Sequence, residues 1–248
     1  MRAANDDHSP PPRVVALDGD DTLWHNETMF STSQDEFRNL VTRHVDLDAA
    51  RLDEVLLGTE RRNLALYGYG IKGFVLSMIE TALEVTGGSI PGQDIEAILR
   101  LGHTMLHYPV ELIDGARDVI EGLRAKDHEV WLITKGDLFD QESKIARSGL
   151  ADLFHRIEIV SEKDEETYRR ILLRHGAAPE EFAMVGNSLR SDILPVAGIG
   201  SRAFHVPYHI TWGVERITGE PSAEFVTLGS LRELPSALGH DAPRIRTY

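Results

Sequence analysis

The chain has 248 residues, of which 42% are hydrophobic and 27% charged, as in an ordinary globular protein. Its formal net charge of −14 argues against a protein that binds the nucleic-acid backbone, because such proteins present basic surfaces. The absence of cysteine excludes disulfides, thiolate zinc sites and a cysteine nucleophile. No stretch approaches the roughly 18 consecutive apolar residues of a membrane span.

Residues 1–12 contain Asp6, Asp7 and a run of prolines, and they lack the apolar core of a secretory signal. We therefore expect a flexible tail and a cytoplasmic location, with no membrane partner. The polar segment 239–248 predicts a second loose tail.

The first predicted strand is the apolar run at residues 14–17, and three aspartates follow it within four positions: Asp18, Asp20 and Asp21. Carboxylates at the carboxyl end of a buried parallel strand lie where open α/β sheets bind their ligands. Like charges so close together are unfavourable unless a cation or a polar network offsets them. Aspartate and glycine are also common in turns, so the run by itself suits a polar turn equally well.

Residues 25–108 show no convincing strand and predict several amphipathic helices. In the first of them, Phe30, Phe37 and Leu40 share one helix face. The segment 86–92, which contains three glycines and a proline, predicts a break between two helices. A wholly helical block that follows the first core strand indicates an inserted cap over an α/β core.

The remainder of the chain alternates between short apolar runs and amphipathic stretches. This alternation predicts a doubly wound parallel sheet, Rossmann-like, with helices on both faces. The predicted strands lie within residues 129–136, 157–163, 182–188 and 202–206, and the predicted helices at 116–126, 141–150 and 165–175. The predicted domains are a discontinuous core at 13–24 and 109–238, and a helical cap at 25–108.

Polar residues end four of the predicted strands, and in a doubly wound sheet such ends converge on one crevice. The set offers a nucleophile, a second carboxylate, a hydroxyl, a lysine and further oxygen ligands. These are the components of metal-assisted displacement at phosphorus. In chain order the residues are Asp18 with Asp20, Thr134 with Lys135, Lys163, and Asn187 with Asp192.

The ordered set resembles the four motifs of the haloacid dehalogenase superfamily over roughly residues 13–207. The family's Asp-x-Asp-x-Thr motif matches residues 18–22, its strand-end hydroxyl matches Thr134 and its lysine matches Lys163. The fourth motif, Gly-Asp with a second aspartate five residues on, matches residues 186–192 with one departure. Asn187 stands where the family usually has aspartate, so the site loses one negative charge.

The resemblance implies a Mg²⁺-dependent phosphatase that acts through an aspartyl-phosphate. Asp18 would be the nucleophile, and Asp20 would protonate the leaving group and then activate water. Mg²⁺ would be held by the carboxylates of Asp18 and Asp192 and by the backbone carbonyl of Asp20. Asn187 would add an uncharged oxygen. The phosphate would be contacted by Thr134, by Lys163, by backbone N–H groups beside Gly19, and at the rim by Lys135.

Two alternatives stay open: a phosphomutase or other phosphotransferase of the same superfamily, and a non-catalytic phosphate-binding member weakened at Asn187. The second aspartate, Asp20, favours a phosphatase, because the dehalogenases that this pattern resembles lack it. A helical cap implies a small phosphorylated metabolite as the partner. The sequence does not predict the oligomeric state, the substrate, or any role for Trp212 and Glu215.

Overall fold

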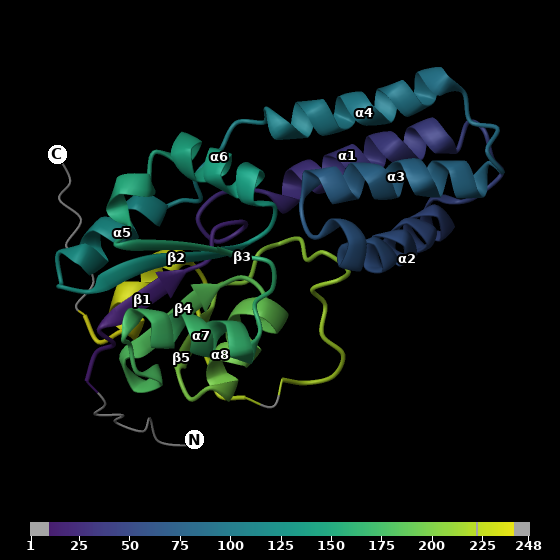
Figure 1. The fold of residues 1–248 in the computed structure, drawn as a ribbon. Coiled ribbons are helices and arrows are strands. Elements are labelled where there is room, and N and C mark those ends of the chain that lie inside the picture. Colours follow the sequence, from purple (N-terminus) through teal and green to yellow (C-terminus); the bar gives the residue numbers. More distant parts are fainter. Residues whose placement is uncertain (1–9, 222, 241–248) are drawn as a thin grey trace.

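The structure is a computed structural model that describes residues 10–221 and 223–240 (Figure 1). The predictions for segments 1–9 and 241–248 lie outside the described residues. An α/β core occupies one end of the molecule and a bundle of helices the other (Figure 1). The sheet of the core has six strands in the order β3-β2-β1-β4-β5-β6, and every neighbouring pair is parallel. The strands are β1 (Val14–Leu17), β2 (Glu129–Lys135), β3 (Arg156–Val160), β4 (Phe182–Gly186), β5 (Arg202–His205) and β6 (Val226–Thr227).

The central strand β1 is buried on both faces, which explains its unbroken run of apolar residues. Successive side chains of a strand point to opposite faces. Val15 and Leu17 accordingly pack into one apolar cluster, while Val14 and Ala16 pack into a second cluster across the sheet. The polar residues that follow β1 therefore begin where both clusters end, at the carboxyl edge of the sheet.

Helices cover both faces of the sheet, so the prediction of a doubly wound core is confirmed. The first face is packed by α5 (Ala116–Arg124), α6 (Leu138–Ser148) and α9 (Leu234–Ala237). The opposite face is packed by α7 (Glu165–His175) and α8 (Leu194–Gly198). Between β4 and α8 the chain forms a turn of π-helix at Leu189–Ile193. The remaining short elements are 3₁₀ turns at Ala151–Leu153, Pro179–Glu181 and Leu231–Glu233.

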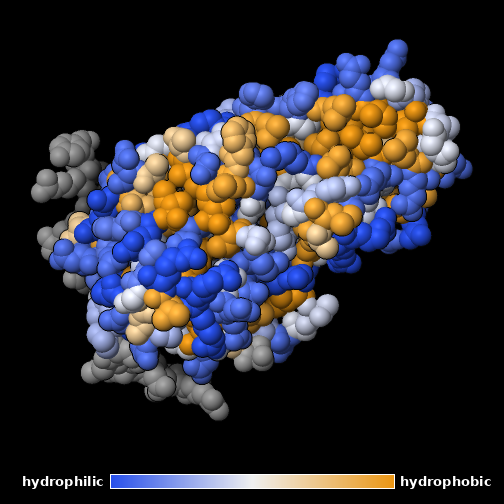
Figure 2. Space-filling model, viewed as in Figure 1, coloured by the Kyte–Doolittle hydropathy of each residue, from blue (hydrophilic) through white to orange (hydrophobic). Residues whose placement is uncertain are grey.

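Four helices between β1 and α5 form the predicted helical cap, and they enclose an apolar cluster of their own. They are α1 (Glu27–Val41), α2 (Ala49–Tyr67), α3 (Ile71–Val85) and α4 (Gly92–Leu106). Hydrophobic residues also gather on the outside of the cap over α1, α3 and α4, in the view of Figure 2. The chain enters and leaves the cap side by side, since Trp24 and Leu112 form an isolated antiparallel bridge.

A long connection between β5 and β6, residues 206–225, reaches from the core to the cap (Figure 1). On it, Trp212 Nε1 donates to Glu60 Oε2 of α2 at 3.4 Å. At the next position of each segment, Arg61 donates to the backbone carbonyl of Gly213 at 3.3 Å. The cap is therefore attached to the core through this connection as well as through its own two chain crossings.

As for the bilayer, none of the helices within the described residues combines the length and the apolar character that crossing it would require.

Candidate active site

The turn after β1 presents two unused backbone donors beside Asp18. Three successive N–H groups, of residues 22 to 24, donate to the carbonyl of Gly19 and tighten the turn. The N–H groups of Gly19 and Asp20 have no acceptor within the described ranges 10–221 and 223–240. Such adjacent backbone donors form an anion-binding concavity. Only glycine fits at position 19, because a Cβ there would lie 2.6 Å from the Trp24 ring and 3.2 Å from Thr134 Oγ1.

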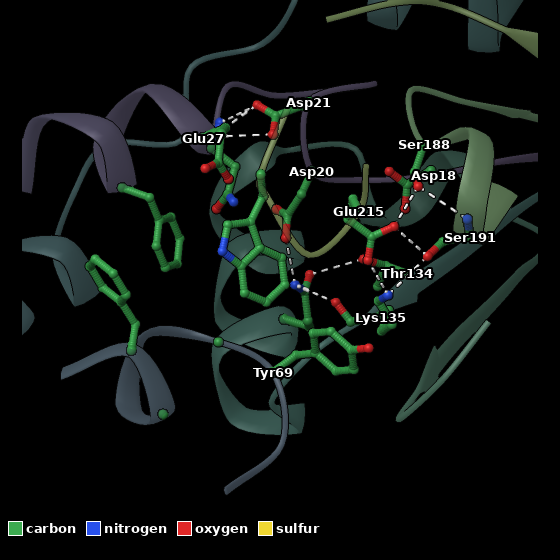
Figure 3. Close-up of a pocket in the computed structure, with 18 of the residues that line it drawn as sticks. Asp18, Asp20, Asp21, Glu27, Tyr69, Thr134, Lys135, Ser188, Ser191 and Glu215 are labelled. Carbon is green, nitrogen blue, oxygen red and sulfur yellow. Dashed lines mark hydrogen bonds and ion pairs between the residues drawn. The ribbon is translucent and has the colours of Figure 1, made fainter. Parts of the chain in front are cut away.

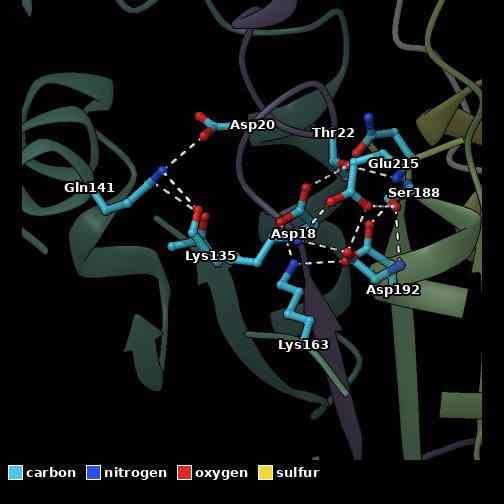
Figure 4. A network of polar contacts seen from close by, with 12 residues as sticks. Asp18, Asp20, Thr22, Lys135, Gln141, Lys163, Ser188, Asp192 and Glu215 are labelled. Atoms are coloured by element: carbon cyan, nitrogen blue, oxygen red, sulfur yellow. Dashed lines mark hydrogen bonds and ion pairs between the residues drawn. The ribbon is translucent and has the colours of Figure 1, made fainter. Parts of the chain in front are cut away.

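A buried lysine joins two of the predicted site carboxylates. Lys163 Nζ lies 2.5 Å from Asp18 Oδ1 and 2.7 Å from Asp192 Oδ1 (Figure 4). Burial alone would lower the pKa of Lys163, but the two carboxylates raise it above its ordinary value, so the ammonium is retained. Burial also raises the pKa of Asp18, and Lys163 opposes that rise. The three residues come from the ends of β1 and β3 and from the turn after β4, as the converging strand ends predict.

Asn187 lies beside these three residues, and the hydroxyl group of Thr22 connects it to Asp18. Thr22 Oγ1 is 3.4 Å from both Asp18 Oδ2 and Asn187 Oδ1, and it accepts the backbone N–H of Asn187 at 3.1 Å. On the other side, Asp192 Oδ2 accepts the N–H of Ser188 at 3.0 Å. The amide of Asn187 therefore occupies its place in the fourth motif with its oxygen directed to the Asp18 side.

These side chains supply oxygen donors of the kind that Mg²⁺ prefers. The carbonyl oxygen of Asp20 receives no hydrogen bond from any residue that the structure describes. Asp18 and Asp192 add carboxylates, and Asn187 an amide oxygen. Among residues 10–221 and 223–240, no group of three or more histidine, cysteine, aspartate or glutamate side chains is arranged to hold a metal ion. The donor set fits a magnesium ion only if the amide and backbone oxygens take part.

The carboxylate of Asp20 is partly exposed to the cavity and is held in position by three donors. Lys144 Nζ lies 2.8 Å from both of its oxygens, Gln141 Nε2 lies 2.8 Å from Oδ2, and Trp24 Nε1 lies 2.7 Å from Oδ1. Burial would raise the pKa of Asp20, but the Lys144 ammonium outweighs it and holds the pKa below its usual range. In Figure 4 the side chain points toward Gln141. Gln141 also accepts from Thr134 Oγ1 at 3.2 Å, which links the second motif to Asp20.

Sequence reasoning missed Lys144 and Gln141, although α6 carries a signal. Its buried positions include Asp140, Gln141 and Lys144, three polar residues on the face that an amphipathic helix turns toward the core. Buried polar side chains need partners: Gln141 and Lys144 find theirs on Asp20, and Asp140 pairs with Lys144 at 3.4 Å. The third aspartate of the motif has a different task, because Asp21 accepts the N–H groups of Asn26 and Glu27 at the start of α1.

Lys135 lies at the rim, but its charge is already paired. Its Nζ lies 2.7 Å from Glu215 Oε1, 2.9 Å from Ser191 Oγ and 4.0 Å from the centre of the Tyr69 ring (Figure 3). Glu215 also accepts from Ser188 at 2.5 Å. Burial would raise the pKa of Glu215, but Lys135 and the serine hydroxyls bring it below its ordinary value. Glu215 was also missed, because it comes from the irregular β5–β6 connection, where no pattern marks it.

Three basic residues of the cap lie on its surface. Arg61 and Arg62 are exposed, and Lys72 pairs with Asp137 at 2.9 Å. Of the turn at residues 67–70, Tyr69 and the glycines Gly68 and Gly70 line the cavity. The cavity has a volume of about 160 Å³ and lies between the strand ends, the cap and the β5–β6 connection (Figure 3). A space of this size takes a small molecule.

Comparisons with known proteins agree with this arrangement. The sequence matches the family described as haloacid dehalogenase-like hydrolase over residues 12–200. It is 25% identical over 204 residues to a glyceraldehyde 3-phosphate phosphatase of Pyrococcus furiosus, covering 79% of this chain and 81% of that protein. Among solved structures, a haloacid dehalogenase-like family hydrolase from Xanthomonas campestris is 41% identical with a TM-score of 0.82, covering 93% of this chain and 96% of that one.

A dehalogenase crystallised with an intermediate complex shares the fold at 14% identity, with a TM-score of 0.64 over 94% of this chain and 99% of that one. At that identity the likeness concerns the fold alone. The family match covers most of the chain, and the Xanthomonas hydrolase resembles it in both sequence and fold. On these grounds the chain belongs to the haloacid dehalogenase-like hydrolases.

Proposed function

We propose that the protein is a Mg²⁺-dependent phosphatase that hydrolyses a small phosphate monoester through an aspartyl-phosphate on Asp18. One observation carries the proposal. The buried Asp18 carboxylate lies beside the free N–H groups of Gly19 and Asp20 and is held by Lys163, which also holds Asp192. A phosphoryl group bound to those N–H groups would place its phosphorus next to the Asp18 carboxylate.

In the first step an Asp18 oxygen forms a bond to phosphorus, and the bond from phosphorus to the ester oxygen breaks. The departing oxygen takes a proton from the Asp20 carboxyl group. In the second step water attacks the aspartyl-phosphate, gives its proton to Asp20 and releases phosphate and the Asp18 carboxylate. Lys163 and the two N–H groups stabilise the negative charge on the equatorial oxygens in both steps.

The lowered pKa of Asp20 suits the second step, in which this carboxylate must accept a proton. In the first step, Asp20 must start with the proton that it gives to the departing oxygen. The contacts from Lys144 and Gln141 hold Asp20 in one position through both steps. We infer that the cycle depends on this pair to orient Asp20.

A magnesium ion would be held by Asp18, Asp192, the Asp20 carbonyl and the amide oxygen of Asn187. When bound, it would neutralise phosphate charge and help orient the phosphoryl group. Because Asn187 brings no charge, we propose that this site binds Mg²⁺ more weakly than one with aspartate there.

The presence of Asp20 favours a phosphatase over a dehalogenase, because halide departure needs no proton. The similarity to a glyceraldehyde 3-phosphate phosphatase points the same way, at 25% identity. A cavity of about 160 Å³ under a helical cap suits a small phosphorylated metabolite rather than a phosphoprotein.

The test is release of phosphate from p-nitrophenyl phosphate with and without Mg²⁺, across pH 5 to 9. Asp18→Asn should lose at least about 10³-fold in kcat, as expected when the nucleophile is removed. The matched control is Asp21→Asn, which keeps an oxygen for the N–H groups at the start of α1 and should remain active. Folded wild-type protein that releases no phosphate under any of these conditions would favour the non-catalytic alternative instead.

A further inference from the structure

The cap end of the cavity has a charge pattern that the phosphatase proposal does not use. Glu27, the first residue of α1, and Glu60 of α2 both line the cavity. Glu60 is only 8% exposed, and its one polar contact within the described residues is the N–H of Trp212 at 3.4 Å. The Glu27 carboxylate has no hydrogen-bond or ion-pair partner among the residues that the structure describes.

Glu60 lies close enough to Glu27 for its charge to act on the Glu27 carboxyl group. Burial raises the pKa of Glu27 well above its ordinary value, and the charges of Asp21 and Glu60 raise it further. Burial likewise raises the pKa of Glu60 to about 7. Two acidic groups whose ionised forms are both disfavoured mark a place where a positive charge would be stabilised.

Within the described residues, no cation of the cavity wall lies at this end; Arg61, the residue after Glu60, is exposed and only partly opposes the rise in the pKa of Glu60. Three lysines line the cavity in the described part of the chain, and each is paired with carboxylates at the core end. Lys163 is bound to Asp18 and Asp192, Lys144 to Asp20, and Lys135 to Glu215. No arginine is among the lining residues that the structure describes.

The same end of the cavity is walled by aromatic rings. Phe30 and Phe74 lie with their ring centroids 5.1 Å apart, and Trp212 lies 6.0 Å from Tyr69 in an edge-to-face arrangement. A face of the Tyr69 ring is already occupied by Lys135, so the rings open to a further cation are those of Phe30, Phe74 and Trp212. All four line the cavity. Aromatic faces attract organic cations, so rings and carboxylates together form a surface suited to an ammonium group.

We infer that the substrate's leaving group carries a positive charge: the protein acts on the phosphate monoester of an amino alcohol, whose ammonium lies between Glu27 and Glu60. This inference rests on the proposed function and adds the substrate class to it. The phosphate faces Asp18 and the two free N–H groups, while the ammonium faces the cap. A leaving group with a carboxylate would be repelled by the same two residues.

Three probes have two carbons each and differ in charge: phosphoethanolamine carries an ammonium, ethyl phosphate has no charge beyond its phosphate, and phosphoglycolate carries a carboxylate. In the wild type with Mg²⁺, kcat/KM should be at least about tenfold higher for phosphoethanolamine than for ethyl phosphate, and lowest for phosphoglycolate. Calorimetric titration of Asp18→Asn with the same three esters should give the same order of affinity without turnover. Equal affinities, a preference for phosphoglycolate, or no binding of phosphoethanolamine would overturn the inference.

Glu60→Gln and Glu27→Gln should each reduce the preference for phosphoethanolamine over ethyl phosphate by about tenfold. Glu84→Gln makes the same change of charge on α3, where the residue is 58% exposed and pairs with Arg62. That control should keep the wild-type preference, and a loss of preference in it would show that only the general charge of the cap matters. If no ester is hydrolysed, including p-nitrophenyl phosphate, the phosphatase proposal fails, and the binding order in Asp18→Asn still decides the ammonium site.

Discussion

Replacing Glu60 with glutamine should remove a charge that the folded protein holds at a disadvantage. Burial raises the pKa of Glu60 to about 7, against an ordinary value of 4.5. At about 1.4 kcal/mol for each step of pKa, ionising this group in the fold costs about 3 kcal/mol once the pH exceeds 7. The folded pKa is the raised one, so the fold avoids this cost below pH 4.5, where Glu60 is protonated in both states. The free energy of unfolding then falls by about that amount as the pH rises from 4.5 to 7. Glutamine offers Trp212 the same oxygen without the charge.

We therefore expect Glu60→Gln to be more stable than the wild type by about 2–3 kcal/mol at pH 8 and equally stable at pH 4.5. Urea unfolding followed by circular dichroism at the two pH values measures both differences. The exposed Glu84→Gln should differ from the wild type by less than about 0.5 kcal/mol at either pH. A Glu60→Gln variant no more stable than the wild type at pH 8 would refute the reasoning that burial, rather than solvent, governs this carboxylate.

Two further substitutions test the packing around the site. Lys144→Met should lower the free energy of unfolding by about 3 kcal/mol at pH 8, because it leaves the partly exposed Asp20 carboxylate and the buried Asp140 carboxylate without their counter-charge. Adding Asp20→Asn should recover part of that loss, and strictly additive losses in urea unfolding would mean that the two residues do not interact. Gly186→Ala should cost about 2 kcal/mol or more, because its methyl group would overlap the Asp192 carboxylate. Gly122→Ala, on the exposed side of α5 with no atom within 4 Å, should instead add about 0.5–1 kcal/mol, and equal shifts of the two variants in calorimetry would contradict this account.

The fold could be predicted from the sequence because each element carries a local pattern. The continuous apolar runs of β1 and β4 reflect strands buried on both faces, and the helical block between β1 and α5 has its own periodicity. Asp18, Lys163 and Asp192 lie together for a reason that the topology supplies, since parallel strands end at the same edge.

The residues that surround this group could not be predicted in the same way. Lys144 contacts Asp20 because α6 packs on the sheet with part of its polar face inward. The spacing of apolar residues in α6 predicts only an ordinary amphipathic helix. Glu215 lies on a connection without periodicity, so nothing in its neighbours marks it as a partner of Lys135. Their contacts arise from tertiary packing, which no short window of sequence records.

The central place of β1 in the sheet has a consequence for the order in which the protein folds. Val14 pairs with Glu129 on one side and Phe182 on the other, both distant in the chain. The cap helices, in contrast, contact neighbours that are close in sequence, and such local contacts form early. Lys163 lies 145 residues after Asp18, so the counter-charge of Asp18 is synthesised long after the carboxylate. A chain released before Lys163 would contain β2 but not β4, so the edge of β1 that pairs with β4 would stay open and accessible to chaperones.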